Sequence, residues 1–299
     1  MNIAQLLFCF MTINIIIYGS IINLYEHKIP KFFSRVFRYG KHAAKGGDSK
    51  LIIEVPKSWF RHFYVIAVPL CTYVDYLLVA VYVFGTRVPE WLNTFLNLFC
   101  GDARIAYTSP SKVLLASFLF TLQIYRRFYD THYVSVFGKE SKLNLTQYIV
   151  GLCHYPGTVI AILSESPLFA KTPNFVSFWA FTYWDIFATV LFIWAWWRQY
   201  VCTEILANLR KNKKGVVVSD RHRLPEDDLF KYLSAPHQTA EILMYLALSI
   251  ILWKNTTFYF VFAWVLSNQV ETILLSHWWY QETFDNYPRN RKALVPFIY

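Results

Sequence analysis

Residues 2–25 read NIAQLLFCFMTINIIIYGSIINLY, and this stretch decides the class of fold. It is long enough for an α-helix to cross a bilayer, which takes about 20 predominantly apolar residues. It lacks the basic start and the small-residue cleavage site of a secretory signal peptide, and it is too long for the apolar core of one. We therefore predict a membrane-spanning helix that is retained in the mature chain.

Six more apolar runs follow, so the whole chain is predicted to be embedded in a membrane. Hydrophobic residues make up 56% of it and charged residues only 16%, which argues against an ordinary soluble domain. One such run could be a buried core helix, but seven in 299 residues cannot. We predict an all-α fold, an integral membrane bundle of seven transmembrane helices in a single domain over residues 1–299. The predicted spans are roughly 3–25, 64–84, 113–129, 147–164, 176–197, 238–253 and 257–276.

The distribution of lysine and arginine predicts the orientation of the bundle. Of the 29 basic residues, 24 lie within or after the first, third, fifth and seventh spans, before the next span begins. Because cytoplasmic segments carry the excess of positive charge, the amino terminus is predicted to be lumenal and the carboxyl terminus cytosolic. The net charge of +10 is then explained by the membrane topology and by contact with anionic lipids, and we expect no nucleic-acid partner.

Familiar nucleotide and metal motifs are missing from the sequence. Glycine is scarce, with ten residues, and neither GxGxxG nor GxxxxGK[ST] occurs, which excludes a Rossmann or P-loop site. The five cysteines are scattered and form no CxxC or Cys/His cluster, so we expect neither a disulfide framework nor a metal site. Any cofactor must therefore be held by helix ends and loops of the bundle itself.

The last 23 residues, HWWYQETFDNYPRNRKALVPFIY from His277 to Tyr299, suggest where a cofactor could bind. His277 and Tyr280 are three apart and therefore share one face of a helix. Both can donate hydrogen bonds, and the basic residues that follow suit a phosphate group. We predict that this segment handles a phosphorylated cofactor at the water boundary.

A second polar segment, about 198–237, contains two basic turns, at 210–215 and 221–225. It ends where a proline helps to start a helix carrying His237 and Glu241, which are four apart and lie one above the other. Each signal alone is weak, because such a pair is often a plain salt bridge and a basic run is usually topology. Together with the tail they form one cationic cytosolic rim bordered by aromatic residues. Such a rim fits a nucleotide phosphate and an adenine face better than a lipid headgroup.

At these residues the chain resembles the steroid 5α-reductase family of membrane NADPH-dependent reductases. The resemblance lies in Arg223-Leu224-Pro225, in the run from Tyr232 to His237 with Glu241, and in the tail from His277 to Phe297. Within the family it is closest to the polyprenol (polyprenal) reductase branch, through RRFYDTHYVSVF at 126–137 and YVCTEILANLRKNKKGVVV at 200–218. The likeness covers about 122–299, and before it only Glu54-Val55-Pro56 resembles a family landmark.

The resemblance implies an enzyme of the endoplasmic reticulum membrane that uses NADPH to reduce a long-chain isoprenoid lipid. Its product would serve dolichol biosynthesis and hence protein N-glycosylation, and no obligate protein partner is expected. The substrate would be held by about residues 1–145, and NADPH by about residues 146–299 from the cytosolic side. Glu54 would line the meeting point of substrate and nicotinamide. The implied cofactor-binding residues are Gln199, Arg210, Arg223, His237, Glu241, His277 and Tyr280.

The chain departs from the family pattern at two positions. His237 stands where relatives often have asparagine, but a neutral histidine still offers one donor and one acceptor, so the role survives. Steroid-converting relatives have a substrate-polarising tyrosine in the third span, where this chain has Ile124. Tyr125 is one residue off, and one residue rotates a helical side chain by about 100°. The candidate catalytic residues are therefore Glu54 and Tyr125, with Tyr129 as another nearby hydroxyl.

Chemistry favours an aldehyde over an alcohol as the immediate substrate. An isolated alkene does not accept hydride, whereas one conjugated to a carbonyl does, because negative charge develops on the carbonyl oxygen. A hydrogen-bond donor to that oxygen is then needed. We therefore expect polyprenal to be reduced in preference to polyprenol.

Other functions remain open from the sequence. A steroid enone reductase (a 3-oxo-5α-steroid 4-dehydrogenase) would share the family motifs. A seven-span receptor or lipid-binding protein would share the topology, although it has no need of cationic and His/Tyr groups gathered on one face. An isoprenylcysteine methyltransferase would use S-adenosylmethionine in a similar cytosolic pocket.

Overall fold

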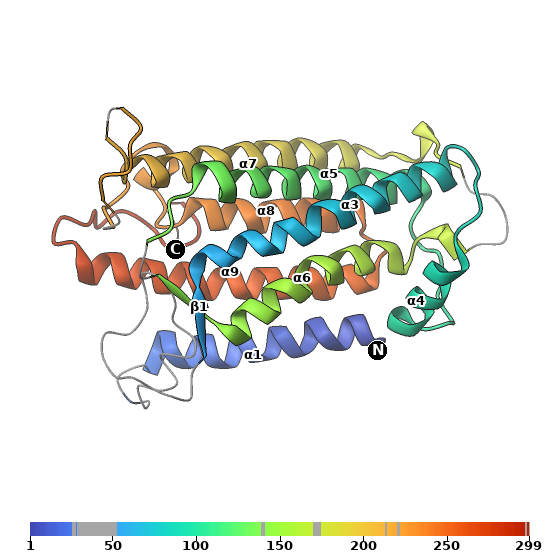
Figure 1. Ribbon diagram of the computed structural model, residues 1–299, viewed down its shortest axis with the longest axis horizontal. Coiled ribbons are helices and arrows are strands. Elements are labelled where there is room, and N and C mark those ends of the chain that lie inside the picture. The colour runs from blue at the N-terminus through green and yellow to red at the C-terminus, as the bar shows by residue number, and fades with distance from the viewer. Residues whose placement is uncertain are drawn as a thin grey trace.

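Long helices dominate the part of the chain that the computed structural model describes, which is residues 1–25, 28, 53–138, 141–169, 175–212, 214–219, 222–296 and 298. They lie lengthwise beside one another in one bundle, with the amino terminus at one end and the carboxyl-terminal segment at the other (Figure 1). The long helices are α1 (Ile3–Tyr25), α3 (Phe60–Tyr82), α5 (Pro110–Tyr129), α6 (Leu145–Ser164), α7 (Tyr183–Asn208), α8 (Pro236–Ile251) and α9 (Thr256–Thr283).

The prediction of a helical fold is confirmed, because each predicted span coincides with one of these helices. The largest shift is in α7, predicted at 176–197, which begins late because Thr182 and Asp185 form a capping box. A shorter helix, α4 (Glu90–Cys100), was not predicted. Three stretches are long and apolar enough to cross a membrane, namely Ile3–Tyr25, Lys57–Tyr82 and Thr256–Thr283. The count of seven crossings and the orientation stay predictions.

A two-stranded sheet, also not predicted, joins the beginnings of two helices. Strand β1 (Glu54–Pro56) pairs antiparallel with β2 (Lys142–Asn144), with Glu54 opposite Asn144. β1 leads into α3 through the short helix η3 (Lys57–Trp59), and β2 leads directly into α6. The pairing therefore fixes the first turns of α3 and α6 beside each other, at the end of the bundle where α9 finishes (Figure 1).

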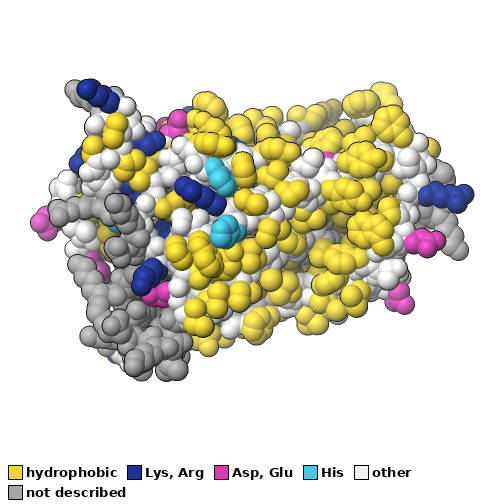
Figure 2. Space-filling model, viewed as in Figure 1, with side chains coloured by type: hydrophobic (Ala, Val, Ile, Leu, Met, Phe, Trp, Pro, Cys, Tyr) yellow, Lys and Arg dark blue, Asp and Glu magenta, His cyan; other side chains and the backbone are white. Residues whose placement is uncertain are grey.

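The surface of the bundle is apolar between its ends. Hydrophobic side chains cover the middle of the face in Figure 2, while charged side chains gather towards the two ends. Phe10 of α1 is 67% exposed, and Ile186 and Val190 of α7 are 60% and 64% exposed. Helices that are apolar on their outer faces as well as their inner ones are expected where lipid surrounds them.

Two buried carboxylates tie helices together inside this apolar body. Glu271 of α9 accepts hydrogen bonds from Ser20 Oγ (3.0 Å) and Asn23 Nδ2 (2.6 Å) of α1. A Cβ atom at Gly19 would lie 2.6 Å from Glu271 Cγ, so glycine is required for α1 to approach this closely. We infer that Glu271 serves the packing of α1 on α9.

Glu165, at the end of α6, caps the beginning of α9. Its carboxylate accepts from the backbone N–H of Thr256 (3.1 Å) and of Thr257 (3.0 Å). It also accepts from both threonine hydroxyls, at 2.6 and 3.2 Å. Asn255 adds a side-chain cap to Phe258 N–H (3.0 Å). The first N–H groups of a helix have no partner within the helix, and its positive dipole end favours an anion, so this contact is structural.

Candidate functional site

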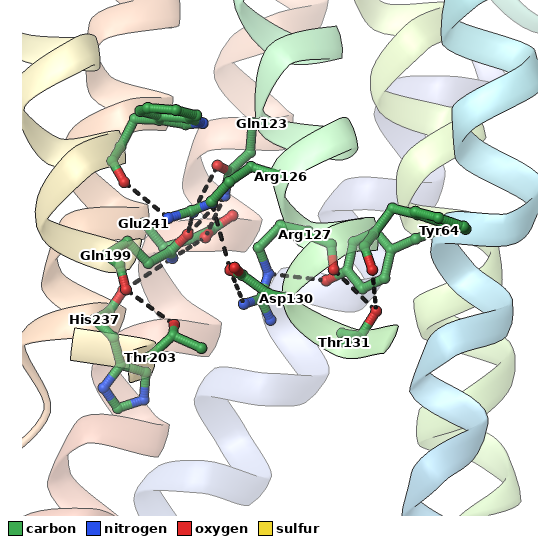
Figure 3. Close-up of polar contacts among 12 residues, drawn as sticks. Tyr64, Gln123, Arg126, Arg127, Asp130, Thr131, Gln199, Thr203, His237 and Glu241 are labelled. Carbon is green, nitrogen blue, oxygen red and sulfur yellow. Dashed lines mark hydrogen bonds and ion pairs between the residues drawn. The ribbon is translucent and has the colours of Figure 1, made fainter. Parts of the chain in front are cut away.

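A network of buried polar side chains joins α5, α7 and α8 near the end of the bundle where α9 finishes. Gln123 Nε2 donates to Gln199 Oε1 (2.8 Å) and to Glu241 Oε2 (3.1 Å). Gln199 Nε2 donates to Glu241 Oε2 and to the backbone oxygen of His237, the latter at 3.0 Å. Three of the residues predicted to bind the cofactor, Gln199, His237 and Glu241, are thus brought together (Figure 3).

Arg126 supplies the positive charge of this network. Its Nη2 donates to Gln123 Oε1 (2.8 Å) and to Gln199 Oε1, and its Nη1 donates to the backbone oxygen of Trp196 (2.8 Å). Asp130 lies 3.4 Å from Arg126 Nε, and the two side chains are almost fully buried. A buried charge is tolerated only when it is paired and hydrogen-bonded, as here. Sequence reasoning missed Gln123 and Arg126, although the two arginines that interrupt an apolar span were the available signal.

The network continues through a π-helical turn, η4 (Asp130–Val134), that directly extends α5. Asp130 Oδ2 lies 3.3 Å from Arg127 Nη1, and Arg127 Nε donates to the hydroxyl of Tyr64 on α3 at 3.2 Å. The hydroxyl of Tyr155 on α6 donates to the same Tyr64 oxygen at 2.8 Å. Single π-turns inside helices often mark functional sites, and this one aligns a polar path from Glu241 to Tyr64 (Figure 3).

A second cluster surrounds His277 near the end of α9. Its Nδ1 lies 2.7 Å from Ser234 Oγ and 3.1 Å from the hydroxyl of Tyr287, and its Nε2 lies 2.9 Å from Gln281 Nε2. The tail is held there by its backbone, because Lys292 N–H donates to the oxygen of Tyr232 (2.8 Å). Ser234 N–H in turn donates to the oxygen of Lys292 (3.0 Å). The tail therefore packs against the segment that precedes α8.

A cationic cavity of about 180 Å³ opens beside this cluster. Arg291 is 2% exposed and lies over the ring of Tyr287, with 5.1 Å from its guanidinium carbon to the ring centre. Its Nε and Nη1 have no hydrogen-bond partner among the residues that the structure describes. Burial raises the pKa of Tyr287, so this phenol stays neutral at physiological pH. The cavity is lined by Leu274, His277, Trp278, Gln281, Arg289, Arg291, Lys292, Ala293 and Ile298.

Unused donors on a buried guanidinium cost stability, because a buried polar group without a partner is destabilising. An oxyanion can accept hydrogen bonds from a buried guanidinium, and arginine is a frequent partner of phosphate groups. The donor set of this cavity therefore fits a phosphate group.

The other residues predicted to bind the cofactor lie around these two clusters. Arg210, at the end of α7, donates to the backbone oxygen of Val136, and its Nη2 lies 3.0 Å from His222 Nδ1. Tyr280 is buried and stacks on Tyr287, with 6.2 Å between ring centres. Arg223 is exposed.

The two predicted catalytic residues are not brought together. Glu54 lies on β1, where its Oε2 is 3.4 Å from Lys142 Nζ. Tyr125 is 47% exposed, and its hydroxyl lies 2.7 Å from Thr72 Oγ1 on the outer side of the bundle. Ile124 and Gln123 face inwards instead. The position of Tyr125 therefore gives no support to its predicted role as proton donor, as the rotation of one helical residue explains.

Comparisons with known proteins place this geometry in context. Residues 158–299 match the family described as 3-oxo-5-alpha-steroid 4-dehydrogenase. Over 99% of its length the chain is 38% identical to a protein of Drosophila melanogaster named polyprenal reductase, covering 93% of that protein. It is 32% identical to proteins of the same name from Homo sapiens and Ailuropoda melanoleuca, over 89% of this chain and 86% of each relative.

Proposed function

Because this chain belongs to the steroid 5α-reductase family, we propose that it is an NADPH-dependent reductase of polyprenal. The reaction would saturate the C=C bond of the α-isoprene unit, next to the aldehyde. The observation that carries the proposal is the similarity to polyprenal reductases over nearly the whole chain. The apolar outer surface of the bundle suits a long isoprenoid substrate that reaches the enzyme from the bilayer.

NADPH fits the two clusters in different ways. The cavity at His277 and Arg291, with Arg289 and Lys292 at its wall, would hold a phosphate of the cofactor. The network of Gln199, Glu241 and the backbone of His237 would offer buried hydrogen-bonding groups to another part of the cofactor. When bound, NADPH would supply the hydride. Arg210, Arg223 and Tyr280 remain proposed contacts at the same end of the bundle.

The wider role of the enzyme is part of the same proposal. Reduction of polyprenal gives dolichal, one step from dolichol, which would connect the enzyme to protein N-glycosylation in the endoplasmic reticulum membrane. The bundle would cross the membrane seven times, with the carboxyl-terminal segment in the cytosol. The substrate half would be about residues 1–145 and the cofactor half about residues 146–299.

The test is a product assay on protein purified in detergent. With NADPH we expect saturation of polyprenal, much slower reaction of polyprenol, and little reaction of a 3-oxo-4-ene steroid. Equal rates on aldehyde and alcohol would contradict the choice of substrate, and preference for the steroid would assign the chain to steroid reduction.

A second measurement tests the cofactor independently of turnover. A ligand that binds only the folded protein raises its melting temperature, and the stabilisation grows with the logarithm of the ligand concentration divided by the dissociation constant. NADPH should stabilise the protein, and S-adenosylmethionine should not. Stabilisation by S-adenosylmethionine alone would favour a methyltransferase, and stabilisation by neither would favour a receptor or lipid-binding protein.

A further inference from the structure

We propose that the hydroxyl of Tyr64 on α3 is the hydrogen-bond donor to the carbonyl oxygen of the substrate. Arg127 and Tyr155 would be positioning residues that hold this hydroxyl. The inference rests on the proposed function, because it assigns the donor that a conjugated aldehyde requires. It fills the role left open by Ile124, where steroid-converting relatives carry a tyrosine.

The hydrogen bonds of Tyr64 single it out. Its oxygen accepts from Arg127 Nε at 3.2 Å and from the Tyr155 hydroxyl at 2.8 Å, which occupies its lone pairs. Its own hydrogen has no acceptor among the residues that the structure describes, although the side chain is only 2% exposed. With the Tyr155 hydroxyl donating to it, Tyr64 keeps its own hydrogen for a bound carbonyl oxygen.

The positive charge of the Arg127 guanidinium also suits Tyr64 to this role. It lies beside the Tyr64 oxygen and over its ring, 5.6 Å from the ring centre, so its charge stabilises negative charge on that oxygen. Asp130 Oδ2 lies 3.3 Å from Arg127 Nη1, and this ion pair fixes the guanidinium in place.

The same contacts connect Tyr64 with the proposed cofactor network. Asp130 touches both Arg127 and Arg126, and Arg126 binds Gln123 and Gln199 next to Glu241. The donor to the substrate and the groups around the cofactor are thus parts of one hydrogen-bonded unit (Figure 3). Tyr125 and Tyr129, by contrast, are 47% and 49% exposed on the outside of α5.

NADPH, when bound, would supply one hydride, which would bond to the β-carbon of the enal while the C=C electron pair moves to form an enolate whose charge rests on the carbonyl oxygen. The Tyr64 O–H donates to that oxygen throughout. A proton from water then bonds to the α-carbon, the enolate electron pair forms this new C–H bond and the C=O bond is restored, so the product is the saturated aldehyde. If Tyr64 gives up its own proton, Arg127 stabilises the phenolate until Tyr155 or water replaces that proton.

The decisive variant is Tyr64→Phe, which removes only the hydroxyl. We expect kcat on polyprenal to fall about 100-fold, the usual size of a lost acid–base contribution, with KM changed by less than about 3-fold. The rise in melting temperature given by NADPH should stay as in the unchanged protein. Tyr76→Phe is the matched control, because Tyr76 lies on the same helix and is 67% exposed. Tyr155→Phe should lower kcat by a smaller factor, about 10-fold.

A pH profile separates chemistry from packing. Fluorotyrosine at position 64 lowers the phenol pKa with almost no change of shape, so the alkaline limb of kcat should move to lower pH. A folded Tyr64→Phe protein that keeps kcat within about 3-fold would overturn the proposal. An alkaline limb that does not move in the fluorotyrosine protein would also overturn the proposal. This second measurement tests the proposal even if Tyr64→Phe does not fold. If the unchanged protein does not reduce polyprenal with NADPH, the proposed function itself fails, which is a separate outcome.

Discussion

Two buried charges near opposite ends of the bundle differ in their hydrogen bonding. Where α9 begins, the Glu165 carboxylate accepts four hydrogen bonds from Thr256 and Thr257 and is satisfied within the protein. Near where α9 ends, Arg291 is also buried but leaves Nε and Nη1 without partners among the described residues. This difference suggests a distinction between structural and ligand-binding charges. A charge that serves the fold has its hydrogen-bond partners within the protein, whereas we expect a charge that binds a ligand to keep donors unused by the protein.

The largest effect should come from Arg291→Met, which removes the unsatisfied charge. NADPH should bind about 100-fold more weakly, equivalent to about 2.8 kcal/mol, because hydrogen bonds to a charged group are lost. The protein without ligand should be as stable as before or more stable, since a costly buried charge has gone. Thermal shift with an NADPH titration measures both quantities, and Lys254→Met at the other end is the control. A less stable variant that binds NADPH normally would make Arg291 a structural residue.

Glu165→Ala should show the reverse pattern. Loss of the cap on α9 should lower the free energy of unfolding by about 2 kcal/mol, and the melting temperature by several degrees. Affinity for NADPH should not change. Thermal unfolding in detergent provides the measurement, and Glu90→Ala, at the exposed first turn of α4, serves as the matched control. Weaker NADPH binding in this variant would contradict the assignment of Glu165 to a purely structural role.

A smaller effect is expected within the His277 cluster, where Ser234 Oγ and the Tyr287 hydroxyl lie 2.7 Å apart. Ser234→Ala and Tyr287→Phe should each weaken NADPH binding. Their effects should not add, with a coupling of about 1 kcal/mol, because both contact His277 Nδ1. A double-mutant cycle of dissociation constants measures the coupling, and strict additivity would show that the two hydroxyls act separately.

The smallest effect belongs to Arg289, which lines the same cavity as Arg291 but is exposed. Arg289→Gln should weaken NADPH binding by about 3-fold at low salt, equivalent to about 0.6 kcal/mol. The difference should nearly vanish at 1 M salt, where screening acts over about 3 Å. A loss as large as that of Arg291→Met would show that burial does not decide which cation matters.

The helices were predictable because their signal is local. A run such as residues 2–25 has no alternative to a helix in lipid, where every backbone group must be satisfied within the segment. The helix that carries His237 and Glu241, and the polar tail after His277, could also be predicted from local sequence. The β1–β2 pairing was not, because it joins three-residue strands that are far apart in the chain and carry no periodic pattern.

The candidate site was predictable in its residue types but not in its connections. Gln199 and Glu241 could be named from motifs, while their partner Gln123 is one polar residue in an apolar helix and carries no motif. The only signal for Arg126 was that a charged residue interrupts an apolar span. Tyr64 and Tyr155 could not be chosen from the many tyrosines of this chain, because a hydroxyl's role depends on which helix faces which.

The backbone hydrogen bonds between Lys292 and the Tyr232–Ser234 segment have a consequence for biosynthesis. Residues 288–296 are translated after α9, so under the predicted topology all the long helices could be inserted in the membrane before the wall of the cationic cavity is complete. A nascent chain would therefore be anchored in lipid yet unable to hold its cofactor until this segment leaves the ribosome and docks. Under the proposed function, loss of a few residues here should leave the helices in place but weaken the binding of the cofactor.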